Sequence, residues 1–334
     1  MKKKYNVYGI GNALVDLEFQ VDEEFLKVHG VKKGLMTLVD VEKQNELIKA
    51  INQEDTRQKP GGSAANTIIA VSQLGGSAFY SCKVANDAHG DFYINDMHNA
   101  GIDTNYLRQK PEEGITGKCL VMITADADRT MNTYLGITSR LSPLEVDENA
   151  IKNAEYVYLE GYLTATDSGF KAMKRAKALA EDNGVKTAIT LSDPSIVENF
   201  GERLKQLTEQ KVDLLFCNEQ EARKFTAKDE LNNAFKELEK AAQAFAVTRG
   251  DEGSVLYDGS DLHDVEPVRI NAVDTNGAGD MFAGTFLYGI TNEMTFKEAG
   301  NLASRTSAKV VSQYGPRLNK DEMRALIEAN ISND

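Results

Sequence analysis

The sequence predicts an α/β protein, in which a three-layer α/β/α domain with a mostly parallel sheet carries a small β-sheet lid. Apolar strands alternate with amphipathic helices along most of the chain, as in domains whose parallel sheet is covered on both faces. Two glycine-rich turns, 60–67 and 274–285, each precede an apolar helical run. Two β-rich stretches, 17–39 and 115–135, interrupt the alternation, and separated segments of this kind can pair into one small sheet.

This pattern divides the chain into two parts. A chain of 334 residues can bury a large core and still add a smaller domain. We expect a large catalytic and nucleotide-binding domain formed by residues 1–15, 41–114 and 137–334, and a lid formed by residues 16–40 and 115–136.

The large domain is predicted from a series of strand–helix units. Residues 5–11 are predicted to form a buried strand, and helix 63–74 follows the first glycine-rich turn. The later units, each a strand and the helix after it, are 77–84 with 90–99, 154–159 with 167–182, 186–191 with 196–209, and 212–216 with 218–225. Strand 244–248 and the helices 295–312 and 319–329 complete the set.

The composition excludes several classes of function. Asp and Glu outnumber Lys and Arg by 51 to 38, and the net charge of −13 argues against a nucleic-acid surface and against docking on anionic membranes. Cys82, Cys119 and Cys217 are widely spaced without a CxxC pair, which fits a reducing compartment. The four histidines lack zinc-like spacing. Polar residues interrupt the first apolar segment, and no run approaches membrane-spanning length. We expect a cytoplasmic protein.

The second glycine-rich turn predicts an anion site. Gly277, Ala278 and Gly279 carry almost no side chain, and an apolar helical run follows them. Small residues at a helix start leave backbone N–H groups free beside the positive end of the helix dipole. Such a site suits a phosphate group.

Asp280 lies at the start of the same helix. An aspartate there is most often only a helix cap. A carboxylate beside an expected phosphate would be repelled unless it had a second role, and the obvious role is to accept a proton from a hydroxyl that attacks a phosphoryl group.

The first glycine-rich turn, Pro-Gly-Gly-Ser-Ala-Ala-Asn-Thr, is a second candidate for ligand contact. Gly61 and Gly62 allow close approach of the backbone to a ligand, and Asn66 lies one helical turn further on. The alternative is a tight strand-to-helix turn with Ser63 as its cap.

The end of the first strand offers two more polar side chains. Gly9-Ile10-Gly11 resembles part of a dinucleotide fingerprint, but Leu14 occupies the third glycine position. Asn12 and Asp16 follow the strand, and strands of α/β sheets carry ligand contacts at their carboxyl ends. The alternative is that both residues are polar groups of a turn.

Taken together, three motifs resemble those of the ribokinase-like (PfkB-type) family of carbohydrate and nucleoside kinases. PGGSAAN at 60–66 is similar to the first signature of that family, Asn218-x-x-Glu221 to its NxxE motif, and DTNGAGDMFAGT at 274–285 to its second signature. The resemblance covers essentially the whole chain. It implies a ribokinase-like fold, ATP as phosphoryl donor, Mg²⁺, and a monovalent cation such as K⁺ in many members.

Within the family, the sequence looks most like the adenosine kinase branch. The matching residues are Gly-x-Gly-Asn-x-Leu-x-Asp at 9–16, Asp128-Arg129-Thr130, Leu-Ser-Asp-Pro at 191–194 and Asn276. One residue departs from this pattern: Ser195 stands where eukaryotic-type adenosine kinases carry an aromatic residue that helps to sandwich the base.

The resemblance assigns the acceptor site to residues from both predicted domains. Ribose hydroxyls would be bound by the polar residues and glycines near the first turn, and a base would lie between apolar side chains. The first group is Asn12, Asp16, Gly61, Gly62, Ser63 and Asn66, and the second is Met36, Leu135 and Tyr162.

The resemblance also assigns the catalytic and nucleotide sites. Asp280 would be the base, the backbone N–H groups of 276–279 would hold the transferring phosphoryl group, and Arg129 would balance its charge unless it is only an exposed lid arginine. Asn218 and Glu221 would position hydrated Mg²⁺, with a helix capping box as the alternative. The remaining candidates are Thr248, Arg249 and Gly250 with Asn276 at the nucleotide, and Asp274 with 311–315 at a monovalent cation.

The function predicted from the sequence is transfer of the γ-phosphate of ATP to the 5′-hydroxyl of a nucleoside, with adenosine converted to AMP in purine salvage. The first alternative is a kinase of the same family for ribose, fructose or ketodeoxygluconate, or for inosine or guanosine. The second is a non-catalytic nucleoside-binding protein, which would have no need of Asp280. The resemblance leaves open a monomer or a homodimer.

Overall fold

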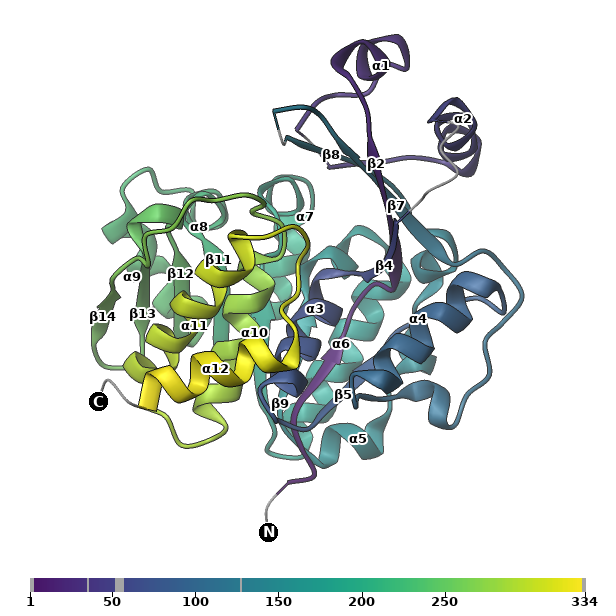
Figure 1. Ribbon diagram of the computed structural model, residues 1–334. Helices are drawn as coiled ribbons and strands as arrows, with labels where there is room; N and C mark the ends of the chain where they lie inside the picture. Colours follow the sequence, from purple (N-terminus) through teal and green to yellow (C-terminus); the bar gives the residue numbers. More distant parts are fainter. Residues whose placement is uncertain (1–2, 35, 52–56, 127, 332–334) are drawn as a thin grey trace.

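The computed structural model describes residues 3–34, 36–51, 57–126 and 128–331. In these residues a nine-stranded sheet lies between layers of helices, and a five-stranded sheet projects from it (Figure 1). We call the two the large sheet and the small sheet. The predicted α/β fold is confirmed.

The large sheet is mostly parallel. Its strand order is β14-β13-β12-β11-β10-β9-β1-β5-β6, and β13 pairs antiparallel with both β12 and β14. In chain order the strands are β1 (Tyr5–Ile10), β5 (Ala78–Ser81), β6 (Asp103–Thr104), β9 (Ala154–Glu160), β10 (Lys186–Thr190), β11 (Val212–Asn218), β12 (Ala242–Thr248), β13 (Ser254–Tyr257) and β14 (Leu262–Val265).

Alternate residues of the central strands face the two helix layers. On β9, Val157 and Leu159 belong to one core cluster, whereas Tyr156 and Tyr158 belong to the other. The first cluster is covered by α5 (Glu148–Lys152), α6 (Asp167–Asp182), α7 (Pro194–Thr208), α8 (Glu219–Thr226) and α9 (Leu231–Ala241). The second is covered by α3 (Ser63–Gln73), α4 (Ala88–Asn99), α10 (Ala278–Ile290) and α11 (Phe296–Val311), and α12 (Lys320–Ile331) packs outside α3 and α10. Within the described part of the chain, no helix has the length and apolar character needed to span a bilayer.

The small sheet brings together the two β-rich stretches, as predicted. Its order is β3-β8-β7-β2-β4, with β2 parallel to β7. The strands are β2 (Leu14–Gln20), β3 (Met36–Leu38), β4 (Arg57–Gly61), β7 (Gly117–Ile123) and β8 (Arg129–Tyr134), and α1 (Glu23–Val28) and α2 (Val41–Ile51) lie beside them (Figure 1).

Strand β4 was not predicted and lies outside the two segments assigned to the lid. It pairs antiparallel with β2, with Gly61 opposite Leu14. Its sequence, Arg-Gln-Lys-Pro-Gly, has no apolar alternation and contains a proline, which is confined to edge strands. The strand therefore forms because β2 is available as a partner. The division into a large domain and a lid stays a prediction.

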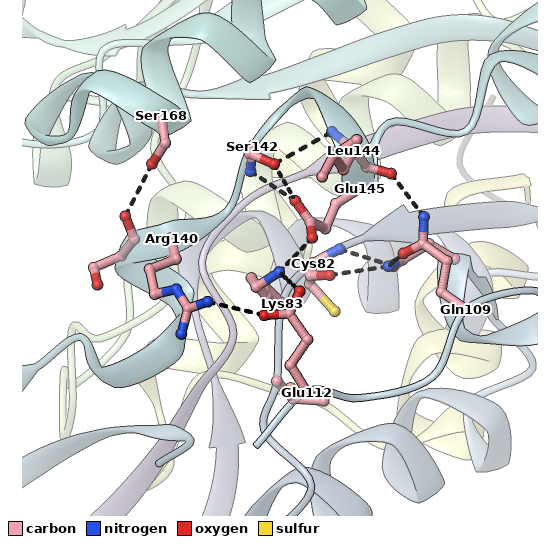
Figure 2. A network of polar contacts seen from close by, with 12 residues as sticks. Cys82, Lys83, Gln109, Glu112, Arg140, Ser142, Leu144, Glu145 and Ser168 are labelled. Atoms are coloured by element: carbon pink, nitrogen blue, oxygen red, sulfur yellow. Dashed lines mark hydrogen bonds and ion pairs between the residues drawn. The ribbon is translucent and has the colours of Figure 1, made fainter. Parts of the chain in front are cut away.

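An ion-pair network centred on a buried pair, Lys83 and Glu145, ties the end of β5 to the segments that lead into and out of the small sheet (Figure 2). Lys83 Nζ lies 2.6 Å from Glu145 Oε1 and 2.6 Å from Glu112 Oε1, and Arg140 contacts the other oxygen of Glu112 at 3.0 Å. The Lys83 and Glu145 side chains are each 6% exposed. Glu145 also completes a capping box with Ser142. Because the charges of Lys83 and Glu145 are both buried, each needs the other to compensate for its removal from water.

Removal of Lys83 should therefore destabilise the fold. We expect Lys83→Met to lower the free energy of unfolding by about 3–5 kcal/mol, because Glu145 would keep a buried and unpaired charge. Urea unfolding measures the change, and Lys152→Met, in an exposed pair with Glu148, is the control that should change it little. Equal stability of the two variants would contradict this account of the network.

Candidate active site

A cavity of about 870 Å³ lies between the large and the small sheet. Residues at or directly after the carboxyl ends of five neighbouring strands line it, namely Asn12, Glu160, Thr190, Asn218 and Thr248. This is the edge at which open α/β sheets bind ligands.

Nearly all of the site residues predicted from the sequence line this cavity. The lining contains Asn12, Asp16, Met36, Gly62, Ser63, Asn66, Arg129, Leu135, Tyr162, Asn218, Glu221, Thr248, Gly250, Asp274, Asn276, Gly277, Ala278, Gly279 and Asp280. Two predicted residues do not belong to it. A Cβ on Gly61 would lie 2.3 Å from Asp16 Oδ1, so this glycine lets β4 pass close to Asp16. Arg249 pairs with Asp264 at 3.1 Å.

The second glycine-rich turn opens helix α10. Gly277 is its N-cap, with φ +77°, a conformation that glycine adopts without strain. Two of the four predicted amides are used inside the chain: Asn276 N–H donates to Asp274 Oδ1 at 3.0 Å and Ala278 N–H donates to Thr275 O at 3.3 Å. Among the described residues, the amides of Gly277 and Gly279 have no hydrogen-bond partner. These two N–H groups are available to an anion.

Asp280 joins the two glycine-rich turns. Ser63 Oγ donates to its Oδ1 at 2.6 Å, and Asn66 Nδ2 donates to its Oδ2 at 3.1 Å. Burial raises the pKa of Asp280 to about 6, although these two hydrogen bonds and the positive charge of Arg317 act in the opposite direction. A carboxyl group with that pKa is ionised at neutral pH and can accept a proton.

Glu160, which was not predicted, supports the acceptor side of the cavity. It lies at the end of β9 and accepts hydrogen bonds from the backbone N–H of Asn12 at 3.1 Å, from Asn12 Nδ2 at 2.8 Å and from the backbone N–H of Ala64 at 2.8 Å. Burial raises the pKa of both Glu160 and Asp16 to about 7. A carboxylate that ends an apolar strand was the sequence signal for Glu160.

Arg317, also not predicted, is connected to Asp280 through Asn66. Its Nε donates to Asn66 Oδ1 at 2.9 Å and its Nη1 contacts Asp96 Oδ2 at 2.7 Å. It belongs to the segment between α11 and α12, of which only 311–315 had been predicted to have a role, at a monovalent cation.

Arg129 links the small sheet to the segment before α10. Its Nη2 lies 2.6 Å from Asp274 Oδ2, and its Nη1 lies 3.6 Å from Glu18 Oε1. The side chain is 10% exposed, so the alternative of an exposed arginine is wrong. Asp274 also accepts the backbone N–H of Gly315 at 2.7 Å. Its charge is thus balanced by Arg129, and its role at a monovalent cation stays a prediction.

Asn218 and Glu221 form a capping box, which was the predicted alternative to a role at Mg²⁺. Asn218 Oδ1 accepts the backbone N–H of Glu221 at 2.8 Å, and Glu221 accepts the backbone N–H of Asn218 at 3.0 Å. Glu221 also lines the cavity, and burial raises its pKa to about 7. The structural role is therefore present, and it leaves a buried carboxyl group facing the cavity.

Comparison with known proteins identifies the family. The profile of the pfkB family of carbohydrate kinases matches residues 31–323. The chain belongs to this family. As a PfkB-family kinase, it is expected to use ATP to phosphorylate a small molecule.

Some relatives of this PfkB-family kinase are named as sugar kinases and others as adenosine kinases. The structure of a probable sugar kinase from Rhizobium etli matches with a TM-score of 0.91 and 32% identity, over 98% of this chain and 99% of that chain. The structure of adenosine kinase from Sinorhizobium meliloti matches with a TM-score of 0.90 and 33% identity, over the same shares. Adenosine kinase of Saccharomyces cerevisiae is 27% identical over 330 residues, which are 92% of this chain and 95% of the yeast protein.

Proposed function

We propose that this kinase transfers the γ-phosphate of ATP to the 5′-hydroxyl of a nucleoside, with adenosine as the preferred acceptor and AMP as the product, in purine salvage. The observation that carries the proposal is the position of Asp280. Its carboxylate lies at the start of α10, beside the available amides of Gly277 and Gly279, and at the edge of a cavity with an apolar wall. The proposed general base, Asp280, is thus next to the two amides that are available to bind the phosphoryl group.

The apolar wall supports a nucleoside over a free sugar. Besides the predicted Met36, Leu135 and Tyr162, it includes Leu14 and Met131 of the small sheet. A base offers an apolar face to such a wall, whereas a free sugar offers mainly hydroxyls. The names of two relatives, the adenosine kinases of Sinorhizobium meliloti and of yeast, support the same reading.

The proposed reaction uses groups of this chain at each step. Asp280 takes the proton of the 5′-hydroxyl as its oxygen attacks the γ-phosphorus and the bond to the bridging oxygen of ADP breaks. The amides of Gly277 and Gly279 hold the transferring phosphoryl group, and Asp16 with Asn12 holds the ribose. Thr248 and Gly250 lie at the nucleotide rim of the same cavity.

Mg²⁺ would act beside Glu221. In the described residues, no group of three or more His, Cys, Asp or Glu side chains could hold a metal ion directly. Glu221 faces the cavity, is buried, and has no cationic partner among the described residues, so it fits a hydrated ion held through water. The ion would neutralise charge on the phosphates. A cytoplasmic location, a need for K⁺, and the choice between monomer and homodimer stay predictions.

An acceptor panel tests the proposal. ATP consumption is measured with Mg²⁺ and K⁺ for adenosine, inosine, guanosine, ribose, fructose and ketodeoxygluconate, each offered separately. We expect the highest kcat/KM for adenosine. A free sugar that wins by about tenfold, which is about 1.4 kcal/mol of transition-state preference, would favour the second candidate, a sugar kinase. The observation that favours this second candidate is the similarity to the Rhizobium etli protein, which is named a probable sugar kinase.

A further inference from the structure

The side chain of Arg317 reaches two elements that lie far from it in the sequence. Its Nε donates to Asn66 Oδ1 on α3 at 2.9 Å, and its Nη1 pairs with Asp96 on α4 at 2.7 Å. Asn66 in turn donates through Nδ2 to Asp280 Oδ2 at 3.1 Å. A chain of three hydrogen bonds thus runs from Asp96 through Arg317 and Asn66 to Asp280.

The chemistry of these groups determines which atom donates and which accepts in each of the three hydrogen bonds. A guanidinium group has only donors, so it can bind the oxygen of the Asn66 amide but never its nitrogen. With that oxygen held by Arg317, the NH₂ group of Asn66 must face Asp280. If the amide turned over, its oxygen would face a carboxylate that has only acceptors when ionised. Arg317 therefore determines which end of Asn66 meets Asp280.

Arg317 also acts on Asp280 through its charge. Burial raises the pKa of Asp280, and among the charged groups around it Arg317 favours the ionised form. The other titratable groups that act on Asp280 or are affected by its charge are Tyr158, Glu160 and Tyr162, on β9 and directly after it. Of these groups, Glu160 would disfavour a second negative charge, and neither tyrosine is positive.

We propose that Arg317 is a positioning residue for the reaction, which holds the Asn66 amide in the orientation that keeps Asp280 hydrogen-bonded and ionised as the base. This inference rests on the proposed function, because it assigns Arg317 to the same proton transfer. It adds a residue from the segment between α11 and α12 to a site whose other members come from the two glycine-rich turns and the strand ends.

Three substitutions separate geometry from charge. Arg317→Gln removes the charge and the forked donors, whereas Arg317→Lys keeps the charge and loses the fork. Arg324→Gln makes the same chemical change at an exposed position of α12 and is the control. Thermal unfolding of each variant confirms that it is folded before its kinetics are compared.

We expect Arg317→Gln to lower kcat by about tenfold or more, because the general base is affected. KM for the acceptor should change by a smaller factor, because Asn66, which Arg317 orients, is also assigned to the ribose. The acidic limb of the kcat/KM profile of Arg317→Gln should move to higher pH, since Asp280 must be ionised to act and loses a neighbouring positive charge. Arg317 also favours the ionised form of Asp16, so the titration of Asp280 itself, described below, assigns the shift. Arg317→Lys should lower kcat while its acidic limb stays at the wild-type pH. The control should match the wild type. An unchanged kcat and an unchanged limb in Arg317→Gln, or an effect on KM alone, would overturn the proposal.

A second measurement separates this inference from the proposed function. The titration of the Asp280 carboxyl carbon, assigned by its absence in Asp280→Asn, is followed by ¹³C NMR without any acceptor. Movement to higher pH in Arg317→Gln supports control of Asp280 by Arg317, and no movement refutes it. If the wild type phosphorylated no member of the panel, the proposed function would fail. The titration would still test whether Arg317 controls the ionisation of Asp280.

Discussion

Asp280→Asn should fold normally and lose about 10³-fold in kcat, within the range that a positioned general base contributes. The new amide can still accept the hydrogen bond of Ser63 through its oxygen. Its NH₂ group then faces the NH₂ group of Asn66, so the hydrogen bond from Asn66 is lost. The new amide cannot take the proton of the attacking hydroxyl. The measurement is kcat with saturating ATP and adenosine.

The substitution also changes the free energy of unfolding, and the pKa of Asp280 gives the direction of the electrostatic part of that change. The folded-state pKa of Asp280, about 6, lies above its ordinary value of 3.8 because the group is buried. The ionised carboxylate therefore costs stability as the pH rises through this range. At pH 7 relief of this cost and loss of the hydrogen bond from Asn66 act in opposite directions, so we expect the free energy of unfolding of Asp280→Asn to lie within about 2 kcal/mol of the wild type.

The matched control for this substitution is Asp91→Asn, because Asp91 is an exposed acid in the first turn of α4. It should leave both kcat and stability nearly unchanged. If Asp280→Asn kept kcat within about tenfold of the wild type, Asp280 would not be the general base.

Gly279→Val should have the second largest effect, a fall in kcat of about 10²-fold, comparable to the loss of one oxyanion-hole donor. A Cβ at Gly279 meets no atom within 4 Å, and the residue is exposed and lines the cavity. The valine side chain would occupy the space beside the available amide, where the phosphoryl group is expected. The fold should be kept, because nothing in the protein has to move.

Two other glycines serve as controls for this prediction. Gly201 on α7 also has no atom within 4 Å of a Cβ, and Gly201→Val should leave kcat unchanged. Gly277→Val should instead destabilise the protein, since Gly277 has φ +77° and its Cβ would lie 2.4 Å from Pro316 Cβ. Normal turnover by a folded Gly279→Val would show that the phosphoryl group is held elsewhere.

Much of this site was predictable because its chemistry is concentrated in short segments. The two glycine-rich turns carry small residues, a helix start and a carboxylate within a few positions, and each of these features acts locally. The turns then meet in space: Ser63 and Asn66 bind the Asp280 carboxylate. The strand–helix alternation predicted the large sheet for the same local reason.

The residues that were missed depend on partners far away in the chain. Arg317 binds Asn66, 251 positions earlier, and Glu160 binds Asn12, 148 positions earlier. Arg317 lies in no such pattern. Glu160 ends an apolar strand, which predicts a place at the ligand edge of the sheet but does not identify Asn12 as its partner. The unpredicted strand β4 exists because β2 offers an edge. Helix α9 is different, since its apolar residues recur at helical spacing and could have been recognised.

The most direct test of the central claim is identification of the product formed from ATP with adenosine and, separately, with 5′-deoxyadenosine. The two acceptors differ only in the hydroxyl that the account treats as the nucleophile, so they present the same base to the apolar wall. The account predicts AMP from adenosine, with the phosphate at the 5′ position, and no phosphorylated product from 5′-deoxyadenosine. A phosphorylated product from 5′-deoxyadenosine, or no turnover of adenosine, would contradict it.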